Sequence, residues 1–100
     1  MKELVKQRSV VGQFIAELRD VEIQKDPLRF RRNLERVGEV MALELSRTLE
    51  YEEREVITPL GSAQVETLKE QPVLATILRA GLPMHQGMLN YFDRADSAFI

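Results

Sequence analysis

The C-terminal third of the chain limits the fold more than any other feature. Residues Val73–Leu78 are apolar almost throughout and do not alternate, which is typical of a strand covered on both faces. A segment with helical spacing follows from Leu82 to Phe92, and residues 97–100, SAFI, begin a second apolar strand. Strand, helix and strand in this order form one βαβ unit, the start of a parallel sheet. We therefore predict an α/β fold that is incomplete within these residues.

Two amphipathic helices are expected in residues 1–49. Ser9 would cap the first helix, which ends near Arg19 and has apolar residues at spacings of three and four. Asp26 and Pro27 would begin a longer second helix, because aspartate caps free amides and proline suits the first helical position. The apolar stripe of this second helix contains Phe30, Leu34, Val37, Val40, Met41, Leu43 and Leu45. A stripe of this width predicts a helix covered on more than one side.

Residues 50–68 predict a β-hairpin. The sequence alternates loosely around Pro59-Leu60-Gly61, so strands near Tyr51–Ile57 and Ala63–Glu66 would flank a turn. Proline cannot donate a ladder hydrogen bond, which places this ribbon at a sheet edge or as a projecting arm. Exposed arms of this kind often pair with a second subunit, so we expect a homodimer or a higher homo-oligomer.

Length and composition exclude several classes of protein. One hundred residues correspond to a single small domain, here divided into residues 1–49, 50–68 and 73–100. With no cysteine and one histidine, a disulfide framework, a thiolate zinc site and a histidine metal cluster are excluded. The net charge of −2 argues against extensive nucleic-acid binding. The sequence has neither a membrane span of roughly 18 apolar residues nor a secretory signal, so we expect a cytoplasmic protein.

An arginine and a glycine stand where the first apolar strand gives way to the helix. Ligands of open α/β sheets bind beyond the carboxyl ends of the strands, where loop amides and a helix N-terminus favour anions. The guanidinium of Arg79 suits two phosphate oxygens, and Gly81 would let the backbone bend tightly and approach a ligand. The pattern suits a phosphate or pyrophosphate loop. The alternative is a structural arginine paired with a carboxylate, and spacing alone does not separate the two.

The residues ILRAGL, followed by M…GML, resemble the pyrophosphate loop of uracil phosphoribosyltransferases, which have the type I phosphoribosyltransferase fold. Three further segments stand in the order that this family shows: AELRD at 16–20, FRRNLERVGEVMALELSRTL at 30–49 and TPLG at 58–61. The resemblance therefore runs from about Phe14 to Ile100. It implies the N-terminal helices, the hairpin and the first βαβ unit of a phosphoribosyltransferase-type parallel sheet.

The resemblance also implies a reaction and a site. The family joins uracil to the ribose of 5-phosphoribosyl 1-pyrophosphate (PRPP), forming UMP and pyrophosphate in pyrimidine salvage. Arg79, Ala80 and Gly81 would contact the pyrophosphate of PRPP, in a loop that can contain a non-proline cis peptide bond. Arg79 would be catalytic, because it would neutralise charge on the leaving group. Mg²⁺ would bind through PRPP rather than through residues of this chain, and family members typically dimerise.

The sequence departs from the family pattern in two ways. The family usually continues RAGLGMVDGML, whereas this chain has Pro83, His85 and Gln86 there. The family's PRPP loop, an acidic-ended strand followed by an Ala-Thr-Gly-Gly-Ser-like turn, does not occur in these residues, and neither does the segment that binds uracil. We therefore expect this chain alone to be inactive.

Other polar residues have simpler interpretations. We interpret His85 as a surface or interface histidine rather than an acid or base. The arginines of the long helix are interpreted as a solvated face paired with Glu35 and Glu39: Arg29, Arg31, Arg32 and Arg36. A nucleotide effector site or an RNA contact is the alternative, since some relatives bind GTP or RNA. A non-catalytic self-associating module and an RNA-binding regulatory relative therefore remain as competing functions.

Overall fold

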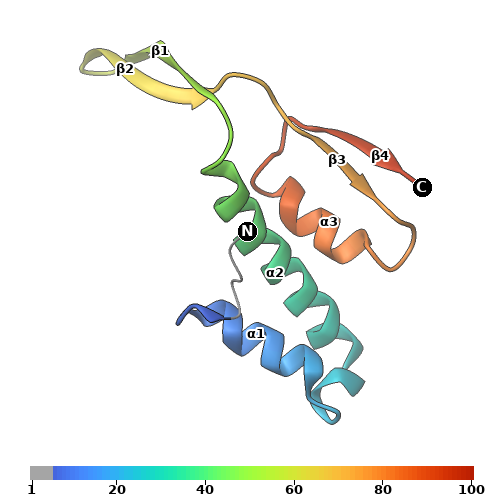
Figure 1. The fold of residues 1–100 in the computed structure, drawn as a ribbon. Coiled ribbons are helices and arrows are strands. Elements are labelled where there is room, and N and C mark those ends of the chain that lie inside the picture. The colour runs from blue at the N-terminus through green and yellow to red at the C-terminus, as the bar shows by residue number, and fades with distance from the viewer. Residues whose placement is uncertain (1–5) are drawn as a thin grey trace.

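The computed structural model describes residues 6–100. Residues 1–5, which belong to the predicted helical part and to the argument against a secretory signal, lie outside the described residues. The elements are α1 (Val10–Arg19), a 3-10 helix (Ile23–Lys25), α2 (Pro27–Ser46), β1 (Tyr51–Thr58), β2 (Gly61–Leu68), β3 (Val73–Thr76), α3 (Leu82–Leu89) and β4 (Asp96–Phe99). Figure 1 shows α1 against α2, α3 between α2 and the strands β3 and β4, and the hairpin projecting beyond the end of α2.

Both predicted helix starts are present. The Oγ of Ser9 accepts a hydrogen bond from the Val11 amide at 3.3 Å. The Oδ1 of Asp26 accepts from the amides of Leu28 and Arg29, at 3.1 and 3.2 Å. These amides have no partner within their own helix, so the caps determine where each helix begins.

The Asp26 cap leads to a first stability prediction. Asp26→Ala is expected to lower the free energy of unfolding by about 1 kcal/mol, because two helix amides lose their acceptor. Urea denaturation followed by circular dichroism measures the change. Asp26→Asn keeps an acceptor oxygen and is the matched control, expected close to wild type. Equal stability of the alanine variant and the wild type would mean that this cap does not stabilise α2.

α2 ends at Ser46 rather than near residue 49 as predicted. The amides of Arg47 and Thr48 donate to carbonyls three residues back, which tightens the last turn. Two hydroxyls also donate to carbonyls here: the Oγ of Ser46 donates to the Leu43 carbonyl at 2.6 Å, and the Oγ1 of Thr48 donates to the Leu45 carbonyl, which its own amide also contacts, at 2.8 Å. With its carbonyls satisfied in this way, the helix stops and the chain turns into the hairpin.

The hairpin is longer than predicted. β1 and β2 pair antiparallel from Tyr51 opposite Leu68 to Thr58 opposite Gly61. Gly61 has a φ of 130°, a backbone conformation open to glycine and strained for other residues. The hairpin projects away from the helices (Figure 1). Side chains near its tip are exposed, Leu60 completely. The prediction of a projecting arm is therefore confirmed.

The predicted βαβ unit is present. β3 and β4 pair in parallel from Val73 opposite Asp96 to Thr76 opposite Phe99. Backbone bonds extend the pairing beyond the strands, since the Ile100 amide donates to the Thr76 carbonyl at 3.0 Å. Together with the helices and the hairpin, this unit confirms the predicted α/β class.

One prediction about the first strand is wrong. The strand ends at Thr76, and one of its faces is bare rather than covered: Leu74 is 8% exposed, but Val73 and Ile77 are 66% and 69% exposed. The reason is the arrangement of layers, because α3 packs against one face of the β3–β4 sheet (Figure 1). Within residues 6–100, no element contributes a layer to the opposite face. The apolar run of sequence therefore did not indicate that both faces of the strand are covered within this chain.

The predicted third helix is shorter than expected. α3 ends at Leu89 rather than at Phe92, and the Phe92 amide donates to the Met88 carbonyl at 2.9 Å in a turn beyond the helix. Phe92 is nevertheless buried, because the turn directs its ring into a core cluster with Ala42 and Leu74. The apolar spacing thus predicted the burial of Phe92 correctly, but it placed the end of the helix too late.

α2 and α3 cross with their backbones in close contact. A Cβ added to Gly38 would overlap the Met84 carbonyl oxygen of α3, and a Cβ added to Gly87 would overlap the Glu35 carbonyl oxygen of α2. The absence of a side chain at these two glycines therefore sets the distance between the helices. α3 begins directly after the loop that contains Arg79, so this crossing also places the loop.

The buried face of α2 differs from its apolar stripe. α1 and α3 both pack against the helix, which confirms coverage on more than one side. Its buried side chains include Val37, but also Asn33 and Ala42, while Leu43 and Leu45 are each 47% exposed. Gly38 is buried on the same face, where the close backbone of α3 leaves no room for a side chain.

Candidate functional site

The candidate site is the loop of residues 77–81, between β3 and α3. Its own backbone closes it: the Gly81 amide donates to the Ile77 carbonyl and the Leu82 amide donates to the Arg79 carbonyl, both at 3.1 Å. The peptide bond between Leu78 and Arg79 is cis, as the resemblance implied for this loop. Because β3 and β4 run in parallel, the loop lies at the carboxyl edge of their sheet (Figure 1).

Arg79 is exposed at this edge. Among residues 6–100, no carboxylate forms an ion pair with its guanidinium. The alternative, a structural arginine paired with a carboxylate, is therefore not supported in the described part of the chain. A planar cation without a protein partner, next to a helix N-terminus, suits an anionic ligand with more than one oxygen.

The loop amides add to this donor set. The amides of Arg79 and Ala80 donate to no acceptor within residues 6–100, whereas the Gly81 amide is engaged with Ile77. Ala80 is also exposed. Two neighbouring unpaired amides and a guanidinium at one sheet edge are the groups by which proteins hold phosphate. The predicted contact by Gly81 would not use its amide.

Gly81 is needed for a different reason than the sequence indicated. Its φ and ψ are −79° and −8°, an ordinary helical conformation, so no unusual bend requires glycine. A Cβ there would instead overlap the Thr76 hydroxyl and lie 3.0 Å from the Ile77 carbonyl oxygen. The glycine lets the loop fold back against the end of β3. Thr76 was missed by the sequence reasoning, although a lone hydroxyl within an apolar strand is a usable signal.

This contact gives a prediction for Gly81→Ala. The added methyl group must displace Thr76 or the loop, so the free energy of unfolding is expected to fall by about 1–3 kcal/mol. Thermal denaturation measures the loss. Adding Thr76→Ala removes the hydroxyl and is expected to restore part of the stability. No recovery in the double variant would place the strain elsewhere.

His85 was expected to be a surface or interface histidine, and the structure contradicts the surface position. His85 is 7% exposed, and its Nε2 lies 3.0 Å from the Oγ of Ser97 on β4. Its ring also contacts that of Phe99, with centroids 5.3 Å apart. The first turn of α3 lies beneath β4, so the side that would have been surface in an isolated helix faces the sheet. Ser97 was missed by the sequence reasoning.

The basic cluster of α2 is mostly engaged within the chain. Three of its arginines have partners: Arg29 pairs with Glu17 at 2.7 Å, Arg32 with Glu35 at 3.4 Å, and Arg36 lies 5.3 Å from the Phe14 ring centroid. The predicted helical pairing with Glu35 is confirmed for one arginine. The predicted pairing with Glu39 is not present among residues 6–100. The side chain of Asn90 instead donates to both carboxylates, to the Oε1 of Glu35 at 3.1 Å and to the Oε2 of Glu39 at 3.3 Å.

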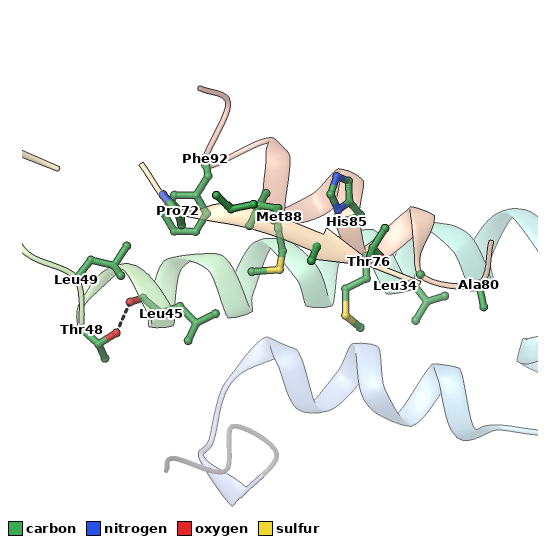
Figure 2. A pocket seen from close by; sticks show the side chains of 15 residues that line it. Leu34, Leu45, Thr48, Leu49, Pro72, Thr76, Ala80, His85, Met88 and Phe92 are labelled. Atoms are coloured by element: carbon green, nitrogen blue, oxygen red, sulfur yellow. Dashed lines mark hydrogen bonds between the residues drawn. The ribbon is translucent and has the colours of Figure 1, made fainter. Parts of the chain in front are cut away.

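An apolar groove of about 430 Å³ adjoins the loop. Figure 2 shows it along β3, with Leu34 and Leu45 from α2, Met88 from α3 and Phe92 around it, and with Thr76, Ala80 and His85 at the end near the loop. The residues that line it include no Asp, Glu, Lys or Arg. A phosphate would lose its hydration there without gaining a charged partner, so the groove is not the anion site.

Neither a cluster of metal-ligand side chains nor a membrane-spanning helix occurs in the described part of the chain. No group of three or more His, Cys, Asp or Glu side chains within residues 6–100 could hold a metal ion. In the same range, no helix combines the length and apolar character needed to cross a bilayer.

Comparisons with known proteins agree on one family. The family model described as uracil phosphoribosyltransferase matches residues 5–100. A uracil phosphoribosyltransferase from Porphyromonas gingivalis is 55% identical over 94 residues, which is 94% of this chain and 44% of that protein. One from Methanothermobacter thermautotrophicus is 44% identical over 77 residues, covering 75% of this chain and 36% of that protein.

The fold also has a solved counterpart. The structure of a protein from Aquifex aeolicus superposes with a TM-score of 0.80 and 26% sequence identity. The alignment covers 93% of this chain and 44% of that one. The chain thus spans less than half the length of the P. gingivalis relative and of this solved structure.

Proposed function

The chain belongs to the uracil phosphoribosyltransferase family, and we propose that it forms the N-terminal part of an enzyme that converts uracil and PRPP to UMP and pyrophosphate. The observation that supports this most is the exposed Arg79, which has no carboxylate partner within residues 6–100 and stands at the carboxyl edge of two parallel strands. In this proposal the enzyme works in the cytoplasm, in pyrimidine salvage.

The loop would act on the leaving group. As the bond between ribose carbon and pyrophosphate breaks, negative charge grows on the departing oxygens. The guanidinium of Arg79 and the amides of Arg79 and Ala80 would stabilise that charge, since groups positioned beforehand need no reorganisation during the reaction. Magnesium would arrive bound to PRPP, where it supplies further charge neutralisation. We assign it no ligand among residues 6–100.

An assay with labelled uracil tests the proposal. The full-length protein that carries this chain is expected to form labelled UMP when PRPP is present, and the 100-residue chain alone to form none. Adenine, guanine and hypoxanthine serve as competing bases. A full-length protein that uses PRPP with one of these bases and not with uracil would reject the proposed substrate.

A second role, self-association, is supported by the hairpin. A two-stranded ribbon is marginally stable in water by itself, yet this one projects from the helices and has Ile57 78% exposed and Leu60 fully exposed. Covering these side chains with a second copy would stabilise the arm. We therefore propose a homodimer or higher homo-oligomer. RNA binding is not part of the proposal, because three of the four clustered arginines are engaged within the chain.

Sedimentation velocity tests the role of the arm. Leu60→Lys is expected to shift the protein toward the monomer, because the lysine puts a charge where the apolar contact is proposed. Gln64→Lys adds the same charge to an exposed arm position without removing an apolar side chain, and is expected to leave the assembly unchanged. A wild-type protein that sediments as a monomer at high concentration would exclude this role.

A further inference from the structure

The loop of residues 77–81 has two ends, and the strand β4 contacts both. At the first end, the Leu78 amide donates to the carbonyl of Ile100, directly after β4, at 3.0 Å. The Ile100 amide donates in turn to the Thr76 carbonyl, also at 3.0 Å. The backbone where the loop leaves β3 is therefore tied to the segment that continues β4.

At the second end, the connection runs through a side chain. The His85 amide donates to the Gly81 carbonyl at 2.9 Å, which closes the first turn of α3 onto the last residue of the loop. The His85 side chain then crosses to β4, where its Nε2 lies 3.0 Å from the Oγ of Ser97. The Phe99 ring, further along the same strand, lies against the imidazole.

We propose that His85 and Ser97 are positioning residues for the pyrophosphate loop. β4 would hold the start of the loop through its backbone and the end of the loop through this pair, so that Arg79 and Ala80 are presented between two fixed points. This inference rests on the proposed function, because the loop is taken as the pyrophosphate site. Neither His85 nor Ser97 is assigned a contact with the ligand.

The α2–α3 crossing holds the first turn of α3 from one side. Gly38 lies against Met84 in that turn and Gly87 lies against Glu35 beyond it, on the opposite side of the helix from β4. In the described structure, the His85–Ser97 contact is the side-chain hydrogen bond that joins the first turn of α3 to the sheet. Removing it would leave the first turn of α3 without its side-chain bond to β4, so the end of the loop would be held less firmly.

The experiment uses the full-length protein and two ligands, PRPP and inorganic pyrophosphate. Ser97→Ala and His85→Leu are each expected to raise the KM for PRPP and the Kd for pyrophosphate about fivefold, as loss of one hydrogen bond would. The KM for uracil is expected to stay at the wild-type value. Calorimetry measures the Kd for pyrophosphate directly, so the test does not depend on turnover.

Three further variants separate positioning from general stability. The double variant is expected to be no weaker than either single variant, because both remove the same contact. His85→Gln keeps an amide that can bond to Ser97 and is expected to recover most of the affinity. Gln86→Ala is the matched control: its Nε2 donates to the Oδ1 of Asn90, directly after α3, at 2.9 Å, and its loss is expected to leave both ligand constants unchanged.

The outcomes distinguish this inference from the proposed function. Wild-type affinity for pyrophosphate in Ser97→Ala would overturn the inference, and Ser97 is exposed, so this variant is expected to fold. The inference would also be overturned if the loss of affinity in the double variant equalled the sum of the two single losses. A lower melting temperature with unchanged ligand constants would overturn it as well. A wild-type protein that binds pyrophosphate but makes no UMP would reject the proposed function instead.

Discussion

Arg79→Ala in the full-length protein is expected to lower kcat by about 100- to 1000-fold, the usual effect of removing one group that stabilises transition-state charge. The free energy of unfolding is expected to stay within about 0.5 kcal/mol of wild type, because Arg79 is exposed and has no ion pair within residues 6–100. Steady-state kinetics with PRPP and uracil, together with urea denaturation, measure the two quantities on the same preparations.

Two control variants make this prediction specific. Arg79→Lys keeps the charge but loses the planar fork that can hold two oxygens at once, so its activity is expected to lie between those of the wild type and the alanine variant. Arg31→Ala removes an exposed arginine from α2 and is expected to retain full activity. If Arg79→Ala is as active as the wild type, this residue has no part in the mechanism.

The second large effect is expected for Gly87→Ala. Alanine favours a helix over glycine by about 1 kcal/mol, which by itself would stabilise α3. Its Cβ, however, would overlap the Glu35 carbonyl oxygen, and a backbone atom cannot turn aside as a flexible side chain can. Overpacking of this kind costs about 1–3 kcal/mol and sometimes more. The clash should therefore outweigh the helix preference, and we expect a net loss of up to about 2 kcal/mol.

Gly12→Ala is the matched control for this helix contact. Gly12 lies within α1, and a Cβ there would meet nothing within 4 Å. This variant is expected to gain up to about 1 kcal/mol, because only the helix preference changes. Thermal denaturation of both variants compares the expected loss of stability in Gly87→Ala with the expected gain in Gly12→Ala. Stabilisation by Gly87→Ala would show that α2 and α3 are further apart than described.

Gly87→Ala should also affect ligand binding. α3 must move away from α2 to accept the methyl group, and the loop of residues 77–81 leads directly into α3. We therefore expect a weaker affinity for pyrophosphate along with the lower stability. The same measurement on Gly12→Ala should show wild-type affinity.

Local features of this chain could be predicted from the sequence because neighbouring residues determine them. Ser9 and Asp26 cap the helices they precede, since each side chain reaches amides two or three residues away. Pro59 and Gly61 specify a turn through their own backbone preferences. The position of Arg79 after an apolar run was enough to place it at the end of a strand. For these residues, the relevant partners lie within a few positions along the chain.

Tertiary structure decided what depends on how elements approach one another. His85 is buried because β4 lies over the first turn of α3, and the need for Gly81 comes from Thr76 at the end of β3. Gly38 and Gly87 are needed because the backbones of α2 and α3 nearly touch there. The spacing of apolar residues along the sequence does not indicate how close two helices come. Hydropathy indicates which residues are buried, but it does not indicate which element covers them or from which side. That depends on how the helices and strands pack.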